Sequence, residues 1–336
     1  MKDQIDPIAD HPHLRTSPSI REWGSLLVAA ALTTWVVYSP RSGQLQWVQV
    51  LHNSGHGPIF GLVAILLLIA ARTHRSFRHW PLALQCVCAV VGSAGLGLAA
   101  EALQAFTHRD PSWMDALNDL VGAVTFVGAF AWFEVRYIRR ERTLLIRSVL
   151  ALVVVAGLVF LLLPAATAAR AYWYRESSFP VLADFDQYVN EFFLSGGRSV
   201  LTQIRLAPEL ARHADEHALE VRFQHGAYPG IDFIEPRADW RDYETLALDI
   251  ANPTDQELSF VLRVHDRHHN HRHDDRFNRI LSVAPHSRAV LEVPLRDIED
   301  GPAHRKLDLD QIAGMTLFRR RGSTADRMDV CKVWLE

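Results

Sequence analysis

The chain has 336 residues, of which 49% are hydrophobic and 22% are charged, and its formal net charge is -3 at pH 7. A slightly negative chain with dispersed basic residues lacks the positive stripe typical of nucleic-acid-binding proteins, so we expect no nucleic-acid partner. The length suits more than one domain. Nearly all long apolar runs lie before Ala169, whereas charge and histidine concentrate after it. The two halves are therefore expected to occupy different solvents.

Five long apolar segments in the first half predict transmembrane helices. A helix needs about 20 residues to cross about 30 Å of hydrocarbon. The fifth segment, SVLALVVVAGLVFLLLPAA, gives the clearest signal. The alternative interpretation, that these segments are buried helices of a soluble bundle, is less favoured. The predicted spans are residues 22–39, 56–72, 81–104, 115–135 and 148–168.

The arginines of the connecting loops predict the orientation in the membrane. Cytoplasmic loops carry an excess of Lys and Arg, and arginine is concentrated after the second and fourth spans, whereas the loops after the first and third offer only Arg41 and Arg109. We therefore expect a multi-pass protein of the bacterial plasma (inner) membrane, with a cytoplasmic N-terminus and an extracytoplasmic C-terminal half. The arginines that set this orientation are Arg72, Arg75, Arg78, Arg136, Arg139, Arg140, Arg142 and Arg147.

Processing and cross-linking signals are weak. The small residues of PAATAARA, which follow the fifth apolar run, resemble a signal-peptidase site, and cleavage there would release the second half of the chain; we expect no cleavage. Of the three cysteines, Cys86 and Cys88 lie in the third span and Cys331 near the C-terminus. This spacing predicts neither a disulfide framework nor a zinc site, and we expect Cys331 to pack in a strand.

A polar, charged segment, EALQAFTHRDPSWMDALNDLVGA, separates the third and fourth spans. Glu101 and Gln104 are three residues apart, as are Asp115 and Asn118, and residues with this spacing share a helix face. The short link between the pairs predicts a helical hairpin that turns both pairs toward each other. Arg109 lies in the link and His56 begins the second span, so acids, amides, a cation and imidazole are expected at one outer surface.

Two interpretations of this polar segment stay open. Small residues in the third and fourth spans allow helices to approach closely, which suits a buried network that only locks the helices together. Ionisable groups of both signs at one interface favour a functional site instead. The small residues are Gly92, Ser93, Gly95, Gly97, Gly122 and Gly128.

The pattern E-x-x-Q-x(4)-R-x-x-S-x-x-D-x-x-N-x(3)-G resembles the signature of the VanZ-like family of small bacterial membrane proteins. An earlier family element, a basic residue followed by His, is only partly matched, because Asn53 stands where a lysine is expected. The resemblance covers about residues 24–138. It implies a cell-envelope protein, of a family whose founding member is associated with tolerance to the glycopeptide teicoplanin, but no settled activity. The matched positions are Glu101, Gln104, Arg109, Ser112, Asp115, Asn118 and Gly122, with His56 in the earlier element.

The chemistry of these residues permits catalysis or binding. Glu101 or Asp115 can act as general base and His56 as general acid, and Arg109 can bind a phosphate or carboxylate. Equally, the same groups can bind an anionic lipid headgroup without chemistry. Gln104, Ser112 and Asn118 are expected to contribute to binding in either case.

Short strands with period-two alternation recur after residue 203 and predict an antiparallel β-sandwich. Leu246, Leu248 and Ile250 should face one way, and so should the apolar residues of LSFVLRVHD. The predicted strands are LEVRF, TLALDIAN, LSFVLRVHD, FNRILSVAP, AVLEVPL, GMTLF and DVCKVWLE.

The order of features in residues 183–336 resembles the galactose-binding-like jelly rolls found among carbohydrate-binding modules. One matched element surrounds the strand after DWRDY, and the second is the D...DRF element. The resemblance implies a carbohydrate or cell-wall glycan as partner. The matched residues are Trp240, Tyr243, Asp249 and Asn252 in the first element and Asp266, Arg276 and Phe277 in the second.

Aromatic faces and flanking hydrogen-bonding groups are what sugar recognition requires. The histidine-rich segment 265–275 also invites a metal interpretation, but its irregular spacing favours a solvated loop with a few ligand contacts. We expect no cofactor other than, at most, a structural calcium with Asp329 as a ligand. The candidate sugar contacts are Tyr228, Trp240, Tyr243, His268, His269, Asn270 and Arg276.

The sequence thus predicts a multi-domain protein: an all-α transmembrane bundle of about five spans, followed by an extracytoplasmic all-β jelly-roll sandwich. The leading functional hypothesis is an accessory factor or receptor in envelope polysaccharide or glycopeptide-related processes, with membrane lipid and glycan as partners. The alternative is a membrane-surface hydrolase or transferase acting on a lipid-linked or cell-wall glycan. The predicted parts are a cytoplasmic tail (1–21), a VanZ-like four-span bundle (22–138), a basic loop with the fifth span (139–169) and the jelly roll (170–336).

Overall fold

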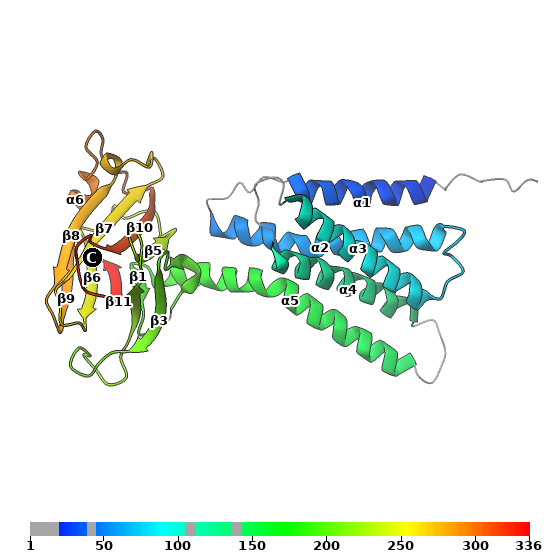
Figure 1. Ribbon diagram of the computed structural model, residues 1–336, viewed down its shortest axis with the longest axis horizontal. Helices are drawn as coiled ribbons and strands as arrows, with labels where there is room; N and C mark the ends of the chain where they lie inside the picture. The colour runs from blue at the N-terminus through cyan, green and yellow to red at the C-terminus, as the bar shows by residue number, and fades with distance from the viewer. Residues whose placement is uncertain (1–19, 39–44, 105–111, 136–142, 188) are drawn as a thin grey trace, which may run out of the picture. The chain divides into compact units, whose positions relative to one another are not determined.

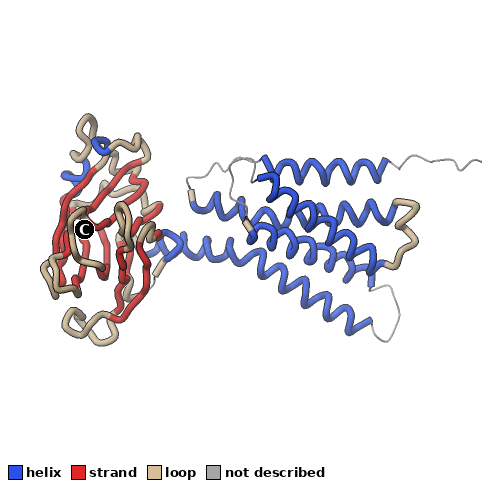
Figure 2. The backbone as a smooth tube through the Cα atoms, viewed as in Figure 1, coloured by secondary structure: helices blue, strands red, loops and turns tan. Residues whose placement is uncertain are grey.

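The computed structural model describes residues 20–38, 45–104, 112–135, 143–187 and 189–336. The chain divides into two compact units, one comprising residues 1–43 with 48–165 and the other residues 44–47 with 166–336. The first unit is helical and the second is built from strands (Figures 1 and 2). Most of the expected N-terminal tail lies outside the described residues.

Five helices precede the strands in the described part of the chain. Four contain stretches long and apolar enough to cross a membrane, namely Gln46–Thr73, Leu82–Leu103, Trp113–Val135 and Thr143–Ser178, whereas the apolar stretch of the first, Trp23–Trp35, is shorter. The second and fifth helices exceed the predicted spans because the apolar run marks only the part suited to hydrocarbon. The helices are α1 (Ile20–Tyr38), α2 (Gln46–Thr73), α3 (Leu82–Gln104), α4 (Trp113–Val135) and α5 (Thr143–Ser178).

Small residues bring α2, α3 and α4 into close contact. A Cβ atom on Gly122 would collide with the backbone of Gly57, so α2 and α4 meet backbone to backbone at this point. The buried Ser93 hydroxyl on α3 donates a 2.8 Å hydrogen bond to the Phe60 carbonyl on α2. Gly97 on α3 lies against the Asp119 side chain on α4. Close packing by small residues, as expected from the sequence, holds these helices together.

The second unit is a sandwich of two antiparallel sheets (Figure 1). One sheet has the strand order β3-β4-β11-β6-β9, with β1 also paired to β11, and the other has the order β2-β5-β10-β7-β8. We call them sheet A and sheet B. A short helix, α6 (Leu295–Glu299), follows β9. The strands are β1 (Val181–Asp184), β2 (Leu194–Ser195), β3 (Ser199–Arg205), β4 (His217–Phe223), β5 (Gly230–Ile234), β6 (Thr245–Asn252), β7 (Leu258–Asp266), β8 (Phe277–Val283), β9 (Ser287–Pro294), β10 (Ile312–Arg319) and β11 (Arg327–Leu335).

The predicted alternation is confirmed in the core between the sheets. Leu246, Leu248 and Ile250 on β6 have no exposed surface and belong to the same core cluster as the apolar residues of β7. The strands β1, β2, β3 and β5 were not among those predicted. The first two are only 4 and 2 residues long, and β3 lies at a sheet edge with several exposed residues, so their hydrophobic pattern is weak.

The outer face of sheet A is covered by the segment between β3 and β4. Leu206 and Leu210 of this segment pack on the small residues Ala218, Ala251 and Cys331, which confirms that Cys331 packs in a strand. Arg288 on β9 fastens the segment, because its guanidinium donates to both Asp249 and Glu216 at 2.7–2.9 Å. The segment therefore covers the part of this face that Ala218, Ala251 and Cys331 form.

Candidate functional site

The structure brings the three predicted catalytic residues together in the helical unit. His56 on α2, Glu101 at the end of α3 and Asp115 at the start of α4 are all buried, and one ligand atom from each lies within 4.8 Å of the other two. The backbone N–H of Ser112 donates a 2.8 Å hydrogen bond to Glu101. The Ser112 hydroxyl in turn accepts from the Asp115 N–H at 3.3 Å, as expected of a residue that caps the N-terminus of a helix.

Asp119 is a fourth member of this cluster that the sequence interpretation missed. Its Oδ1 lies 3.3 Å from His56 Nδ1, and its side chain is only 1% exposed. Asp119 follows Asp115 by four residues, and this spacing places both on one face of α4. The same spacing rule that paired Asp115 with Asn118 would have identified it.

The remaining predicted residues of the polar segment are less closely tied to the cluster. Asn118 is half-buried on α4. Gln104 ends α3, but its side chain lies outside the described residues, as does Arg109 entirely. His52 lies one turn before His56, and the two imidazole rings meet edge to face with centroids 6.0 Å apart.

The outer face of sheet B carries two parallel rows of side chains. In the first row, strand register aligns Asp232, Thr316, Arg263 and Asn278 across β5, β10, β7 and β8. Thr316 donates a 2.7 Å hydrogen bond to Asp232. In the second row, two residues further along each strand, the register aligns Gly230, Phe318, Val261 and Ile280. The face therefore has a polar row beside an apolar one.

Tyr228 extends the apolar row. Its ring meets Phe318 edge to face with centroids 5.3 Å apart, and 68% of the residue is exposed. The Arg263 guanidinium also lies over the Phe318 ring, 4.6 Å from its centroid. A cleft of about 270 Å³ lies beside Tyr228, and Arg320 and Arg321 are among the residues that line it. Aromatic surface and cationic groups thus occur together.

Two arginines on this side of the sandwich carry charge without a carboxylate partner. Neither Arg263 nor Arg276 forms an ion pair with any described residue, and the Nε atom of each is buried without a hydrogen-bond acceptor. Burial lowers the pKa of both guanidinium groups, and for Arg263 the charge of Arg276 lowers it further. Both groups remain cations at neutral pH, because an arginine in a protein stays protonated. An anion on this face would satisfy them.

Histidines lie next to the polar row, beginning with His265, two residues after Arg263 on β7. His265 lies opposite Gly314, whose lack of a side chain leaves room for the imidazole ring. Burial, followed by the nearby His269 and Arg263 charges, lowers the pKa of His265 to about 4, so the ring is neutral at physiological pH. The rings of His269 and His271 follow, with neighbouring centroids 5.2 and 5.5 Å apart.

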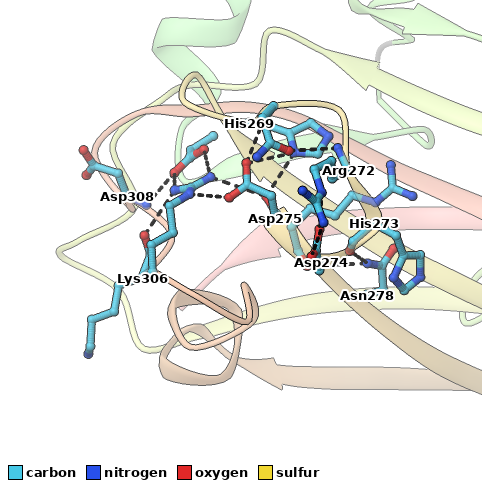
Figure 3. A network of polar contacts seen from close by, with 12 residues as sticks. His269, Arg272, His273, Asp274, Asp275, Asn278, Lys306 and Asp308 are labelled. Atoms are coloured by element: carbon cyan, nitrogen blue, oxygen red, sulfur yellow. Dashed lines mark hydrogen bonds and ion pairs between the residues drawn. The ribbon is translucent and has the colours of Figure 1, made fainter.

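The histidine-rich loop is held by ion pairs rather than by a metal-binding arrangement of its own (Figure 3). The Arg305 guanidinium donates to Asp266 at 2.5 and 2.8 Å and to Asp275 at 2.5 Å. Asp275 then accepts from the Asn270 N–H, and its carbonyl lies 3.0 Å from His269 Nδ1. Among the described residues, no three of these side chains gather as ligands of one ion. His268 is exposed on the loop.

Two of the predicted sugar contacts, Trp240 and Tyr243, and the predicted calcium ligand Asp329 lie elsewhere in the sandwich. Trp240 has no exposed surface, and its indole N–H donates a 2.7 Å hydrogen bond to the Arg237 carbonyl. The ring is thus a core residue and offers no face to a sugar, which corrects its assignment as a contact. Tyr243 is half-buried against Phe179. Asp329 is buried on β11, and within the described chain no set of three ligand residues forms around it.

Period-two alternation contains the signal for the residues that were missed. Leu262 and Val264 point into the core, so Arg263 and His265 must point outward from the same strand.

No protein-family model matches the chain, and no curated protein matches it either. Solved structures that resemble its C-terminal β region include carbohydrate-binding modules. A family 11 module from Clostridium thermocellum, in complex with a β-1,3-1,4-mixed-linked tetrasaccharide, is 17% identical, and the match covers 46% of this chain and 93% of the module with a TM-score of 0.33. A family 28 module specific for non-crystalline cellulose is 12% identical, with 46% and 92% covered and a TM-score of 0.33.

An exo-β-agarase is 15% identical over 46% of this chain, with a TM-score of 0.38. The match spans only 25% of the agarase chain. The similarity to this enzyme is thus confined to about a quarter of its length.

Proposed function

We propose that this protein is a membrane-anchored glycan-binding protein of the bacterial envelope, in which the helical unit is VanZ-like and lies in the plasma membrane and the sandwich faces outward. It would act as an accessory factor or receptor in envelope polysaccharide or glycopeptide-related processes. The observation that carries the proposal is the outer face of sheet B, where a polar row ending in Asn278 runs beside the exposed side chains of Ile280 and Tyr228.

Such a face suits a sugar chain because a pyranose ring has apolar C–H surfaces and polar hydroxyl edges. The exposed Tyr228 ring, which packs on the buried Phe318, provides aromatic surface, while Asp232, Thr316 and Asn278 provide donors and acceptors. Binding sites combine apolar lining with a few placed polar groups in the same way. On the opposite outer face, residues 206–216 cover the part around Ala218, Ala251 and Cys331.

The charge of the face favours an acidic glycan. Arg263 and Arg276 have no carboxylate partner among the described residues, and Arg320 and Arg321 line the cleft beside Tyr228. Guanidinium groups bind carboxylate, sulfate and phosphate oxygens through paired hydrogen bonds. We therefore infer that the ligand carries such groups at regular positions along the chain.

The test is binding of the full-length protein in detergent to matched acidic and neutral polysaccharides. Polygalacturonate is compared with its methyl-esterified form, and dextran sulfate with dextran, alongside peptidoglycan fragments. The acidic member of each pair should bind more tightly and lose affinity as salt rises. Equal binding of both members of a pair would contradict the inferred charge preference. If none of the glycans bound, glycan binding itself would be contradicted.

Substitutions then locate the site. A hydrogen bond to a charged group contributes about 1.5–3 kcal/mol, so Arg263→Gln and Arg276→Gln should each weaken acidic-glycan binding by about tenfold or more. Tyr228→Ala should weaken acidic and neutral glycans alike, because it removes apolar surface. Arg241→Gln is the matched control, since Arg241 is exposed and paired with Asp239 in a different loop.

Membrane insertion of the helical unit is supported by its exposed apolar surface. Within α5, side chains such as Leu144, Leu152 and Leu162 are 62–74% exposed, an arrangement that lipid would cover. The VanZ-like assignment is supported by the clustering of His56, Glu101 and Asp115, which are matched positions of that family pattern. Accessibility labelling of single cysteines in the outer loops and in the sandwich, on intact cells, tests the outward orientation.

The same cluster favours a second candidate function, a membrane-surface enzyme acting on a lipid-linked glycan. Glu101 has one carboxylate oxygen without a hydrogen bond, as a general base requires. Turnover of a lipid-linked peptidoglycan precursor by the wild type but not by Glu101→Gln, with glycan binding retained in both, would establish this function. No turnover of the precursor by the wild type would leave the receptor function in place.

A further inference from the structure

The buried cluster on α2, α3 and α4 contains more carboxylate groups than the described basic residues around it can neutralise. Glu101, Asp115 and Asp119 are 6%, 5% and 1% exposed. No Lys or Arg of the described residues forms an ion pair with any of the three, and within that part of the chain His56 is the one basic group in contact. Carboxylates out of water need a compensating positive charge. The cluster therefore calls for a cation.

Several polar side-chain atoms in this cluster are also without hydrogen bonds. Glu101 Oε1, both oxygens of Asp119 and His56 Nδ1 are buried and unsatisfied. His56 Nδ1 and Asp119 Oδ1 lie 3.3 Å apart, within ion-pair distance, but their geometry forms no hydrogen bond. Buried polar atoms in folded proteins nearly always have partners. Unsatisfied atoms on three separate helices converge here on one volume.

From this geometry we propose that His56, Glu101 and Asp115 bind a divalent first-row transition cation, with Asp119 as a positioning residue. One ligand atom from each lies within 4.8 Å of the others. Two ligand atoms at about 2.1 Å from a tetrahedral zinc ion are about 3.4 Å apart. The three atoms therefore need to draw together by no more than about 1.4 Å, a distance within the reach of side-chain rotation.

The mixture of ligands selects the class of cation. Calcium and magnesium prefer a shell made entirely of oxygen, whereas an imidazole nitrogen combined with carboxylate oxygens suits zinc or manganese. No cysteine is needed for such a site. Three protein ligands also leave coordination positions open, as in metal sites that bind water or substrate.

Asp119 completes the arrangement by orienting His56. A metal-bound histidine normally donates its second ring N–H to a carboxylate, which fixes the tautomer and the direction of the ring. Because His56 Nδ1 lies 3.3 Å from Asp119 Oδ1, Nε2 is the ring nitrogen assigned to the ion, and a small rotation would complete the hydrogen bond to Asp119. Gly97 provides the space for the Asp119 carboxylate, because a Cβ atom there would touch it.

The test is metal binding by the full-length protein, purified in detergent without chelator. Metal content is measured by mass spectrometry, and the chelator-stripped protein is then titrated separately with Zn²⁺, Mn²⁺, Mg²⁺ and Ca²⁺ by calorimetry. We expect about one Zn²⁺ or Mn²⁺ per chain and a melting temperature that rises with the bound ion. No binding by the stripped wild type, with no change in melting temperature, would overturn the proposal. Equal affinity for Ca²⁺ would overturn the nitrogen-containing ligand set.

Variants separate ligands from the positioning residue. Glu101→Gln and Asp115→Asn should abolish stoichiometric binding, whereas Asp119→Asn should weaken it by about 10–100-fold, as loss of a supporting carboxylate does. Glu134→Gln is the matched control, because this carboxylate lies on α4 but pairs with Arg72 outside the cluster. Unchanged binding in Glu101→Gln and Asp115→Asn would place the ion elsewhere and overturn the assignment.

Misfolding is distinguished from ligand loss by melting in metal-free buffer. The amide variants lose carboxylate repulsion, so they should melt at or above the wild-type temperature while failing to respond to metal. The glycan-binding measurements do not depend on this site, and either result can hold without the other.

Discussion

Arg305 is the residue whose loss should most directly free the histidine-rich loop. Its guanidinium joins Asp266, at the end of β7, to Asp275, near the start of β8. The Asp266 side chain has no exposed surface, and it also accepts a hydrogen bond from the Asp308 N–H. Replacing Arg305 with Met keeps most of the apolar stem of the side chain but leaves the buried Asp266 charge with only the Asp308 N–H, among the described residues, as a partner.

The cost follows from the burial of the pair. Breaking a buried ion pair by removing one partner costs about 3–5 kcal/mol. Because the Arg305 side chain is 28% exposed, solvent reduces that figure, and we expect a loss of about 2–3 kcal/mol in the free energy of unfolding. For a domain of this size the melting temperature should fall by about 5–10 °C.

The assay is urea unfolding of a fragment spanning residues 170–336, followed by tryptophan fluorescence. The main core cluster lies entirely within residues 179–335, so this fragment contains its own core. Arg272→Met is the control, because Arg272 lies in the same loop but makes an exposed pair with Asp274. Exposed pairs contribute about 0–1 kcal/mol. Hydrogen exchange should quicken in residues 267–276 in the Arg305 variant only.

The pH dependence supplies a second check. Burial by itself would raise the pKa of Asp266, but hydrogen bonds from Arg305 and the Asp308 N–H hold it below its ordinary value. The stabilisation is therefore present above the unfolded pKa of about 3.9 and is lost as the pH falls through the folded value. The difference between wild type and Arg305→Met should shrink toward pH 3. Equal free energies of unfolding for Arg305→Met and Arg272→Met at pH 7 would refute the assigned role of Arg305.

Three further predictions concern single residues. Burial raises the pKa of Asp329 from 3.8 to about 6, so the folded state keeps this proton longer and stability falls as pH rises from 4 to 6; Asp329→Asn should gain up to about 3 kcal/mol at pH 7 in urea unfolding, and a loss would contradict this. The pKa of His265, lowered from 6.5 to about 4 mainly by burial, has the opposite effect: acidification from pH 6.5 to 4 should destabilise the wild type more than His265→Gln, whereas parallel profiles would exclude it. Gly122→Ala should lower the melting temperature in detergent, because its Cβ would strike Gly57 and overpacking costs about 1–3 kcal/mol; Gly95→Ala, which meets nothing within 4 Å, should behave as wild type.

The sequence predicted the elements that local periodicity defines. The strands TLALDIAN and LSFVLRVHD match β6 and β7 residue for residue, because one buried face imposes strict alternation. The apolar runs likewise predicted α3 and α4 to within two residues at their N-terminal ends. Short strands such as β2 escaped prediction because two residues contain too little pattern.

The grouping of His56, Glu101 and Asp115 was also predictable, since motif spacing and the expected hairpin point to one surface. Asp119 and Gly97 were not connected to it, because their contact depends on the rotation of α4 against α3. Trp240 shows the converse error, since an aromatic residue in a polar stretch looks exposed in sequence but fills the core.

The sequence by itself determined which segments are apolar helices, which are strands and which strand faces are buried, because those properties depend on neighbours within a few residues. Only the tertiary structure decided how the outer faces of the sheets are built. Residues 206–216 fold over part of sheet A, and on sheet B strand register aligns Arg263 with Thr316 and Asn278 from distant parts of the chain. Register and crossover connections are set by packing between segments far apart in sequence, and no local pattern specifies them.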